Sequence, residues 1–279
     1  MLLNLDQNFK PLEGDEILFE KFIFPGGEPH IKIKSHSNLS DPVTITHRIN
    51  SFNDLGLLCI AVDALKIMQV KIKDLFIPYF PAARQDRVMV PGEPLTLKVY
   101  ADIINNLHFE NVIIYDVHSA VTPTYLNNCI IISNHQFVKQ VINLIGNKVL
   151  LISPDAGSLK KIYQLSEFLG KMEVIECSKS RDVKNGKLKG FTVNANNLQE
   201  MDCLVVDDIC DGGATFIGLA KELKHKNAGK LYLAVSHGIF SKGFDELECF
   251  DRLFTTNSVK DITHPRLTQL KLNNSLLSH

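Results

Sequence analysis

The sequence lacks several features that would restrict its function. No apolar run approaches the roughly 18 residues needed to cross a bilayer. The first residues, MLLNLDQNFK, carry an acid at position 6 and no basic stretch, unlike a secretory signal. The net charge is −1, from 30 basic and 31 acidic side chains, which provides no electrostatic basis for binding nucleic acid or an anionic membrane. We therefore expect a cytoplasmic protein that uses neither partner.

Paired cysteines are also lacking. The six cysteines are scattered without a single Cys-x-x-Cys pair, which argues against a zinc site and against a disulfide framework. The chain is 45% hydrophobic with a low net charge, which argues against disorder. Its 279 residues suit one large or two medium domains, because single cores stop growing at about 250–300 residues.

What the sequence does contain is an alternation of two periodicities. Short apolar runs that end in polar residues predict strands, namely VKIKDLFIPYFP, NVIIYDVHS, KVLLISPDAG, MEVIECSKS, DCLVVDDICDGG and KLYLAVSHG. Helical spacing predicts helices over 95–107, 134–145, 158–169 and 215–226. This order predicts βαβ units around buried parallel sheets, and ligands bind at the carboxyl ends of such strands.

The strand–helix units form two series, which predict an N-terminal domain over residues 1–133 and a C-terminal domain over 134–279. FPGGEPHIKI predicts a hairpin whose turn contains Gly26 and Glu28. The stretch 178–190, SKSRDVKNGKLKG, is basic and has no apolar period, so we expect a mobile loop there.

The segment LVVDDICDGGAT is the most informative part of the chain. An apolar strand ends at Asp207 and Asp208, and a turn with Gly212 and Gly213 leads into a helix. Glycine lets backbone N–H groups approach an anion, and a helix N-terminus favours negative charge. The two acids suit sugar hydroxyls, or a Mg²⁺ that bridges phosphates. The alternative is an ordinary helix start that Asp211 caps, with solvated acids.

This segment resembles the phosphoribosyl-binding signature of phosphoribosyltransferases and of phosphoribosyl pyrophosphate synthetases (ribose-phosphate diphosphokinases). Other segments resemble the synthetases specifically and follow in their order, namely FIFPGGEPHIKI, IPYFPAARQDR, IIYDVH and ISPDAGSLKK. The resemblance covers most of the chain. It implies an α/β fold with two phosphoribosyltransferase-type, Rossmann-like domains, each a mostly parallel sheet flanked by helices.

The resemblance further implies an enzyme that transfers the β,γ-diphosphate of ATP to the 1-hydroxyl of ribose 5-phosphate, with Mg²⁺ as cofactor. It implies that Arg84, Gln85 and His118 bind ATP. Phe24 and Glu28 would meet the adenine from a neighbouring subunit, which implies a homodimer or a higher homo-oligomer. Without the resemblance, Arg84 would be an exposed ion-pairing residue and Phe24 a core residue.

The remaining roles concern the metal, the transferred group and the sugar. By resemblance, His118 and Asp155 hold the metal, and Lys179 and Arg181 belong to a catalytic loop. Charges that arrive when such a loop closes stabilise the transition state more than the free substrate. The resemblance also implies that the ribose hydroxyls of the sugar phosphate bind Asp207 and Asp208. Its 5-phosphate would bind the loop of Asp211, Gly212, Gly213, Ala214 and Thr215.

The chain departs from the family at the phosphate loop, where the usual Asp-Thr-x-x-Thr reads Asp-Gly-Gly-Ala-Thr. One lost charge-assisted hydrogen bond would weaken monophosphate binding by roughly 1.5–3 kcal/mol. The extra space could instead admit a larger 5-substituted ribose such as ADP-ribose, which would link the chain to NAD metabolism. Two further alternatives are a phosphoribosyltransferase, which needs no ATP segment, and a non-catalytic synthetase-associated regulatory subunit, which could dispense with Lys179 and Arg181.

Overall fold

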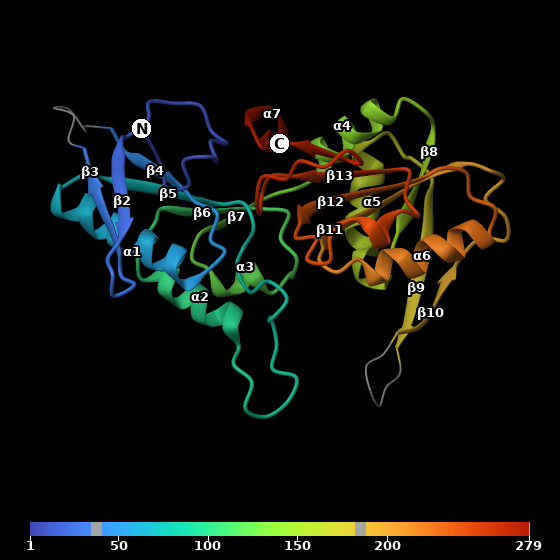
Figure 1. The fold of residues 1–279 in the computed structure, drawn as a ribbon, viewed down its shortest axis with the longest axis horizontal. Coiled ribbons are helices and arrows are strands. Elements are labelled where there is room, and N and C mark those ends of the chain that lie inside the picture. Colours follow the sequence, from blue (N-terminus) through green and yellow to red (C-terminus); the bar gives the residue numbers. More distant parts are fainter. Residues whose placement is uncertain (35–40, 182–187, 279) are drawn as a thin grey trace. The chain divides into compact units, whose positions relative to one another are not determined.

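The computed structural model of the protein describes residues 1–34, 41–181 and 188–278. Contacts between Cα atoms group the chain into two compact units, one of residues Met1–Ser133 with Lys271–His279 and the other of Asn134–Leu270. The sequence assigns residues 271–279 to the C-terminal half, whereas their contacts group them with the first unit. Both units are α/β, as the sequence predicts (Figure 1).

The elements of the first unit are β1 (Leu2–Asn4), β2 (Phe19–Ile23), β3 (Pro29–Ile33), β4 (Val43–Thr46), α1 (Phe52–Ile67), β5 (Ile72–Ile77), α2 (Thr96–Asn105), β6 (Asn111–Tyr115), α3 (Thr122–Tyr125), β7 (Cys129–Ile132) and α7 (Asn274–Leu277). Five strands form a parallel sheet in the order β1-β4-β5-β6-β7. From β4 to β7 the chain advances in one direction across the sheet. Because parallel crossovers are right-handed, α1 and α2 lie on the same face (Figure 1).

The first unit also contains elements that the sequence patterns did not indicate. The longest is α1, which is rich in apolar residues and buries Leu55, Leu58 and Leu65 among others. A helix that is apolar on most sides has no clear amphipathic period, so a search for period 3.6 passes over it. Its start does have a signal, because the hydroxyl of Ser51 accepts from the N–H of Asp54 and donates to its carboxylate.

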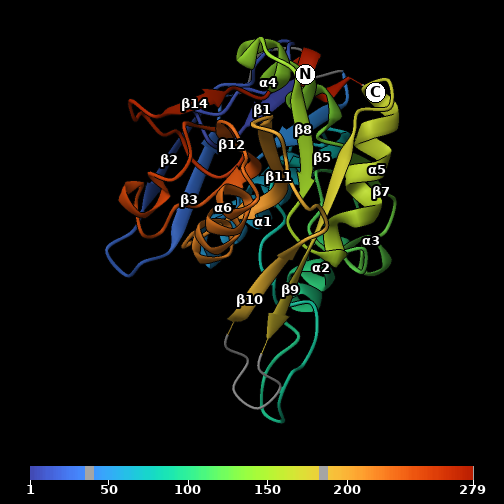
Figure 2. The same cartoon turned by 90° about the vertical axis from the view of Figure 1, so that its right-hand side faces the viewer.

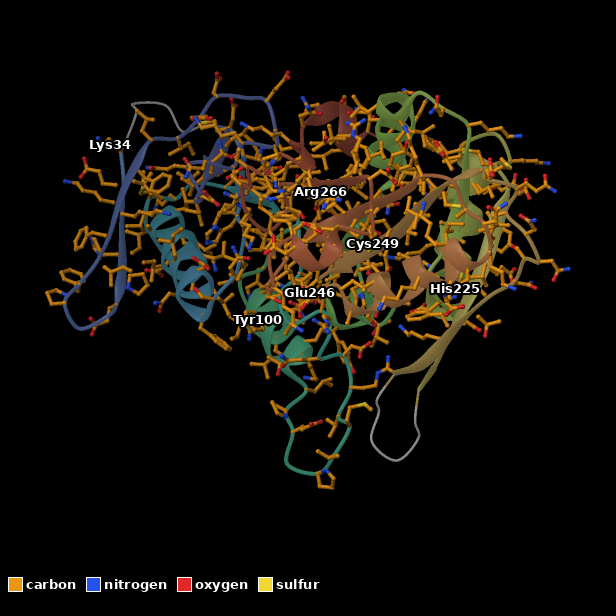
Figure 3. All side chains as sticks on the ribbon, turned by 45° about the vertical axis from the view of Figure 1, so that its right-hand side comes forward. Lys34, Tyr100, His225, Glu246, Cys249 and Arg266 are labelled. Atoms are coloured by element: carbon orange, nitrogen blue, oxygen red, sulfur yellow. The ribbon has the colours of Figure 1, made fainter. Side chains whose placement is uncertain are left out.

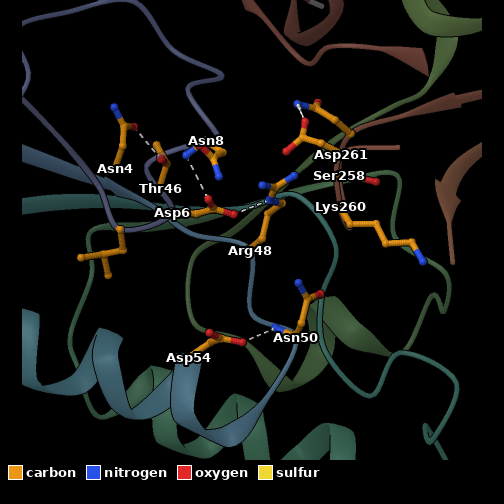
Figure 4. Close-up of polar contacts among 12 residues, drawn as sticks. Asn4, Asp6, Asn8, Thr46, Arg48, Asn50, Asp54, Ser258, Lys260 and Asp261 are labelled. Carbon is orange, nitrogen blue, oxygen red and sulfur yellow. Dashed lines mark hydrogen bonds and ion pairs between the residues drawn. The ribbon is translucent and has the colours of Figure 1, made fainter. Parts of the chain in front are cut away.

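Polar residues gather at the carboxyl ends of β1 and β4 (Figure 4). Arg48 Nε donates to Asp6 Oδ2 at 2.5 Å, and Thr46 Oγ1 donates to Asn4 Oδ1 at 2.6 Å. Burial raises the pKa of Asp6, but the hydrogen bond and positive charge of Arg48 outweigh it and leave the pKa below its ordinary value. The Arg48 guanidinium also lies 5.1 Å from the centre of the Phe9 ring. This pair holds the chain after β1 against the end of β4.

The elements of the second unit are α4 (His135–Ile145), β8 (Val149–Ser153), η1 (Ala156–Ser158), α5 (Leu159–Phe168), β9 (Val174–Arg181), β10 (Leu188–Val193), β11 (Asp202–Cys210), α6 (Ala214–His225), β12 (Leu231–Gly238), η2 (Asp245–Leu247), β13 (Arg252–Thr256) and β14 (Leu267–Leu270). The sheet order is β10-β9-β8-β11-β12-β13-β14, parallel except for the β9–β10 pair. From β8 the chain crosses to β9 on one side, and from β11 to β12 on the other. The crossover helices α5 and α6 therefore cover opposite faces (Figure 2).

The predicted strands and helices of both units are present, but the expected loop at 178–190 is partly wrong. Residues up to Arg181 extend β9, and the chain from Leu188 to Gly190 belongs to β10. Strand pairing with antiparallel register overrides the weak local pattern of this basic segment. Residues 182–187 lie outside the described residues, so the expectation of a loop is not addressed there.

A ring pair on the first unit and three buried thiols in the second complete the description of the packing. Tyr100 on α2, which Figure 3 labels, stacks on Phe52, and the ring centres are 4.8 Å apart. In the second unit, burial raises the pKa of the thiols of Cys177, Cys203 and Cys210 to about 12. Within the described residues, no helix combines the length and apolarity needed to cross a membrane.

The core of the second unit provides a test of this packing. Leu233 on β12 is fully buried, whereas Leu144 on α4 is 45% exposed. Leu233→Ala should lower the free energy of unfolding by about 2–5 kcal/mol, because it removes buried methyl groups and leaves a cavity. Leu144→Ala is the matched control and should cost well under half as much. Denaturant unfolding of both variants measures the difference, and equal losses would contradict the assignment of Leu233 to the core.

Candidate functional site

The candidate site of the second unit lies where the order of its strands reverses. β8 and β11 are neighbours, with Val205 opposite Ile152, and their crossovers leave in opposite directions. Ligands of open α/β sheets bind beyond the carboxyl ends of the strands at such a switch point. Asp155 follows β8, and Asp207 and Asp208 lie near the end of β11. The topology thus brings three of the predicted site residues to one edge of the sheet.

A small cavity occurs at this edge, and its lining residues are Asn134, Ser158, Lys161, Ile162, Leu165, Val206, Asp207 and Asp208. Lys161 on α5 places its Nζ 3.4 Å from Asp208 Oδ2, and the Asp208 side chain is 8% exposed. Sequence reasoning did not single out Lys161, although it follows the PDAG segment by four residues. A lysine on the first turns of a helix carries no sequence signal for a contact with a strand 47 residues later.

The ionised form of the Asp207 carboxyl group is energetically unfavourable at this position. Desolvation by the surrounding protein and the negative charges of Asp208 and Asp155 raise the pKa of Asp207 well above its ordinary value. The hydrogen bond from the N–H of Asp208 and the positive charge of Lys161 lower this pKa, but by less. Asp207 Oδ1 accepts that N–H at 2.9 Å. Groups that donate hydrogen bonds, or cations, would relieve this cost, so the acids suit a ligand that is rich in hydroxyl groups.

The predicted phosphate loop joins β11 to α6. Gly213 adopts a left-handed conformation with φ of 78°, and a Cβ there would lie 3.0 Å from the Leu247 side chain. The carbonyl of Gly213 accepts from the N–H groups of Phe216 and Ile217. The N–H groups of Ala214 and Thr215 have no intrahelical carbonyl to bond, because they begin the helix. Asp211 does not occupy the N-cap position expected in the alternative, because the N-cap residue is Gly213, which has no side chain.

The predicted metal residue Asp155 starts the short helix η1. Its Oδ1 accepts from the N–H groups of Gly157 and Ser158 at 2.8 and 3.2 Å, and its Oδ2 accepts from Lys179 Nζ. Lys179 lies on β9, so the structure brings a predicted catalytic cation to the predicted metal carboxylate. Arg181 ends β9, and its side chain lies outside the described residues.

In the first unit, the predicted ATP residues occupy two joined loops. Arg84 and Gln85 are exposed in the loop after β5, and His118 is exposed after β6. Ser119 Oγ donates to Asp86 Oδ2 at 2.6 Å and thereby ties the two loops together. The hydrogen bond from Arg87 lowers the pKa of Asp86, burial opposes it, and the bond from Ser119 adds to the lowering.

The predicted adenine residues lie in the turn of the β2–β3 hairpin. Phe24 is 46% exposed, so its alternative placement in the core is wrong. Its ring lies edge-on to Phe22 at 4.8 Å and to His30 at 5.5 Å. The Glu28 carboxylate folds back over Gly26, where a Cβ would lie 2.5 Å from Oε2. An exposed aromatic cluster next to a carboxylate is a suitable platform for a purine base.

No compact metal cage is present in the described ranges. Across residues 1–34, 41–181 and 188–278, no group of three His, Cys, Asp or Glu side chains could hold a metal ion. Mg²⁺ is commonly held by one or two carboxylates together with substrate phosphates and water. The oxygen donor of Asp155, whose charge also acts on the nearby Asp207, fits that mode. His118, which lies in the first unit, is an unusual Mg²⁺ ligand because imidazole suits softer metals.

Comparison with known proteins bears on the same segments. A family model described as the N-terminal domain of ribose phosphate pyrophosphokinase matches residues 18–107, and one described as a phosphoribosyl transferase domain matches residues 126–268. A ribose-phosphate pyrophosphokinase from Mycoplasma pneumoniae is 30% identical over 264 residues, covering 89% of this chain and 78% of that protein. The chain belongs to the ribose-phosphate pyrophosphokinase family. The predicted family membership is confirmed.

One further relative and one solved structure are also similar to this chain. The ribose-phosphate pyrophosphokinase of Mycoplasma genitalium is 29% identical over 261 residues, covering 89% of this chain and 77% of that protein. A crystal structure of phosphoribosylpyrophosphate synthetase from Mycobacterium smegmatis matches with a TM-score of 0.81 at 22% identity, covering 98% of this chain and 94% of that one. The predicted fold class is therefore confirmed, and so is the prediction of an enzyme of the ATP-dependent transferase class.

The raised pKa of Asp207 predicts how stability depends on pH. A carboxyl whose folded pKa is raised favours folding while it is protonated, so its contribution is lost as pH rises above the ordinary value of 3.8. Asp207→Asn removes the charge and should raise Tm at pH 7 by about 2–4 °C, the shift that about 1 kcal/mol produces in a domain of this size. The gain over wild type should shrink as pH falls toward 4.

Thermal melts of Asp207→Asn and wild type between pH 4 and 8 measure this effect. Asp245→Asn, an exposed acid of the same unit, is the control and should leave Tm unchanged at every pH. A Tm of Asp207→Asn at or below that of wild type at pH 7 would contradict the charge cost assigned to Asp207.

Proposed function

We propose that the chain is a ribose-phosphate diphosphokinase, which converts ATP and ribose 5-phosphate into phosphoribosyl pyrophosphate and AMP. The observation that carries the proposal is the switch point of the second unit. There, the acids Asp207 and Asp208 precede the N-terminus of α6, whose N-cap residue is Gly213. The ammonium of Lys179, on the adjacent strand β9, contacts the carboxylate of Asp155. Family membership and the coverage of most of the length of its relatives support the same reaction.

In this reaction the anomeric hydroxyl oxygen attacks the β-phosphorus of ATP. A new O–P bond forms, the bond from the β-phosphorus to the bridging oxygen of AMP breaks, and the hydroxyl proton leaves to solvent or to a base. Catalysis of phosphoryl-type transfer depends mainly on positioning the groups and on offsetting their charge. The roles below assign these tasks to residues.

The acceptor would bind along β11 and the loop that follows it. Asp207 and Asp208 accept hydrogen bonds from the ribose 2- and 3-hydroxyls, which is consistent with the charge cost of Asp207. The 5-phosphate binds the loop from Asp211 through Gly212, Gly213 and Ala214 to Thr215. N–H groups at the start of α6 and the hydroxyl of Thr215 are its donors.

ATP would bind the joined loops of the first unit and the hairpin of a neighbouring copy. Arg84 stacks on or grips the nucleotide as a planar cation, and Gln85 lies beside it. Phe24 and Glu28 of the neighbouring copy meet the adenine, so the active protein is a homodimer or a higher homo-oligomer. The exposure of the Phe24 ring supports a partner for it.

Mg²⁺ would be held by Asp155, by the phosphates of ATP and, directly or through water, by His118. When bound, the ion withdraws charge from the phosphate oxygens and orients them. The carboxylate of Asp155 has its orientation fixed by two N–H groups of η1, so it is ready to serve as an oxygen ligand.

Lys179 and Arg181 would stabilise the charge of the transferring diphosphate. The contact of Lys179 with Asp155 shows that its ammonium reaches the carboxylate proposed to hold the metal–phosphate unit. A cation that leaves this carboxylate and binds the diphosphate instead stabilises the transition state more than the free enzyme.

The second candidate acceptor is a larger 5-substituted ribose such as ADP-ribose, with the same diphosphate transfer. It is favoured by the loop itself, in which Ala214 is exposed and Gly212 has no side chain. Such an acceptor would link the chain to NAD metabolism.

The decisive experiment incubates the protein with ATP and Mg²⁺ and with either ribose 5-phosphate or ADP-ribose, and follows AMP by chromatography. AMP that forms with ribose 5-phosphate, together with phosphoribosyl pyrophosphate, is the expected result. AMP with ADP-ribose alone selects the second acceptor. No AMP with either acceptor would reject diphosphokinase activity and favour the phosphoribosyltransferase or the non-catalytic subunit.

Lys179 provides a separate prediction. Lys179→Ala should lower kcat by two orders of magnitude or more, because it removes a cation from the transition state. Stability should change by about 1 kcal/mol or less, since the Lys179–Asp155 pair is partly exposed. Lys179→Arg should recover part of the rate, and Lys171→Ala, at an exposed position after α5, is the control. Near-normal turnover of Lys179→Ala would remove Lys179 from the mechanism.

A further inference from the structure

The chain after β12 lies directly on the predicted phosphate loop. The N–H groups of Ile239 and Phe240 donate to the carbonyl of Cys210 at 2.9 and 3.1 Å, and the N–H of Ser241 donates to the carbonyl of Asp211 at 3.2 Å. These three bonds join consecutive residues of the two segments. They fix the backbone position of the next residue, Lys242, beside the loop.

The side chain of Lys242 runs over Gly212. A Cβ built on Gly212 would lie 3.4 Å from Cδ, 3.5 Å from Cε and 3.7 Å from Cγ of Lys242, which are ordinary contact distances. The aliphatic stem therefore covers the backbone of the loop while the residue itself is exposed. Within the parts of the chain that the structure describes, no carboxylate lies within 4.0 Å of its ammonium.

The segment that carries Lys242 is well anchored. Phe240 has a positive φ of 46°, and a Cβ on Gly238 would lie 2.3 Å from its ring, so the two residues are closely packed. The Phe240 ring contacts Phe244 at 4.9 Å, and Phe244 stacks on His264 at 4.2 Å. Lys242 thus projects from a backbone held by packing on both sides, which limits the entropy lost when it binds an anion.

The loop needs a cation for a phosphate to bind well. Asp207, Asp208 and Asp211 place negative charge just before it, and Gly212, at the position of the first Thr in the usual Asp-Thr-x-x-Thr loop, contributes no hydroxyl donor. An ammonium that reaches over the loop offsets that charge and supplies a charge-assisted hydrogen bond. We propose that Lys242 is a binding residue for the phosphate on C5 of the acceptor, in place of the missing hydroxyl. This inference rests on the proposed function, and either acceptor carries such a phosphate.

Lys242→Met keeps the aliphatic stem and removes the charge. It should raise KM for the accepted sugar phosphate about tenfold or more, with kcat changed less than threefold and KM for ATP unchanged, because the contact is made in the ground state and the transition state alike. Lys242→Arg should restore KM to within about threefold of wild type. Lys221→Met, at an exposed position of α6, is the matched control and should behave as wild type.

Calorimetric titration of ribose 5-phosphate and of ADP-ribose, without ATP, separates this inference from the proposed reaction. If wild type releases no AMP, the diphosphokinase proposal fails, yet weaker binding of either acceptor by Lys242→Met than by Lys221→Met still supports the role of Lys242. If the two variants bind both acceptors equally well, or if wild type binds neither, the role of Lys242 is overturned. The acceptor whose binding the Lys242→Met substitution weakens more is the one whose phosphate Lys242 binds.

Discussion

Repulsion between carboxylates at one edge of a parallel sheet is the interaction on which the candidate site depends. The reversal of strand order puts the ends of β8 and β11 side by side, and each end carries acids. The protein compensates with lysines from two separate elements, Lys161 on α5 and Lys179 on β9, while the stem of Lys242 lies over the loop that follows β11. The pKa of Asp207 remains raised despite Lys161, so the compensation is incomplete. Residual charge cost of this kind is typical of sites that await a ligand.

The two units differ in how the polar side chains at the carboxyl ends of their strands are satisfied. In the first unit the chain advances one way across the sheet, and polar side chains after the strands satisfy one another, as in Asp6 with Arg48 and Asp86 with Ser119. In the second unit the sheet has a switch point, and its acids are left facing a cavity. Topology therefore leaves acids at a cavity in the second unit, whereas polar pairs fix the loops of the first unit, including those proposed to bind ATP.

Much of the fold follows from local patterns, and the missed parts have physical reasons. α2, α4, α5 and α6 show an amphipathic period, and the strands of the second sheet are continuous apolar runs because both faces are covered. α1 has no such period, since it is apolar on most sides. The acids and glycines of the site are readable because they lie at the ends of apolar strands or directly after them. Lys161 and Lys242 are not, because their contacts arise from tertiary placement across the sheet.

The buried thiols have a practical consequence. Cys177 on β9 and Cys203 and Cys210 on β11 line the strands that carry the site, and their pKa values near 12 leave almost no thiolate at neutral pH. An alkylating reagent would reach these sulfurs only during an opening of the second unit. Their labelling rate therefore measures local unfolding around the strands of the candidate site, and no cysteine has to be introduced for the measurement.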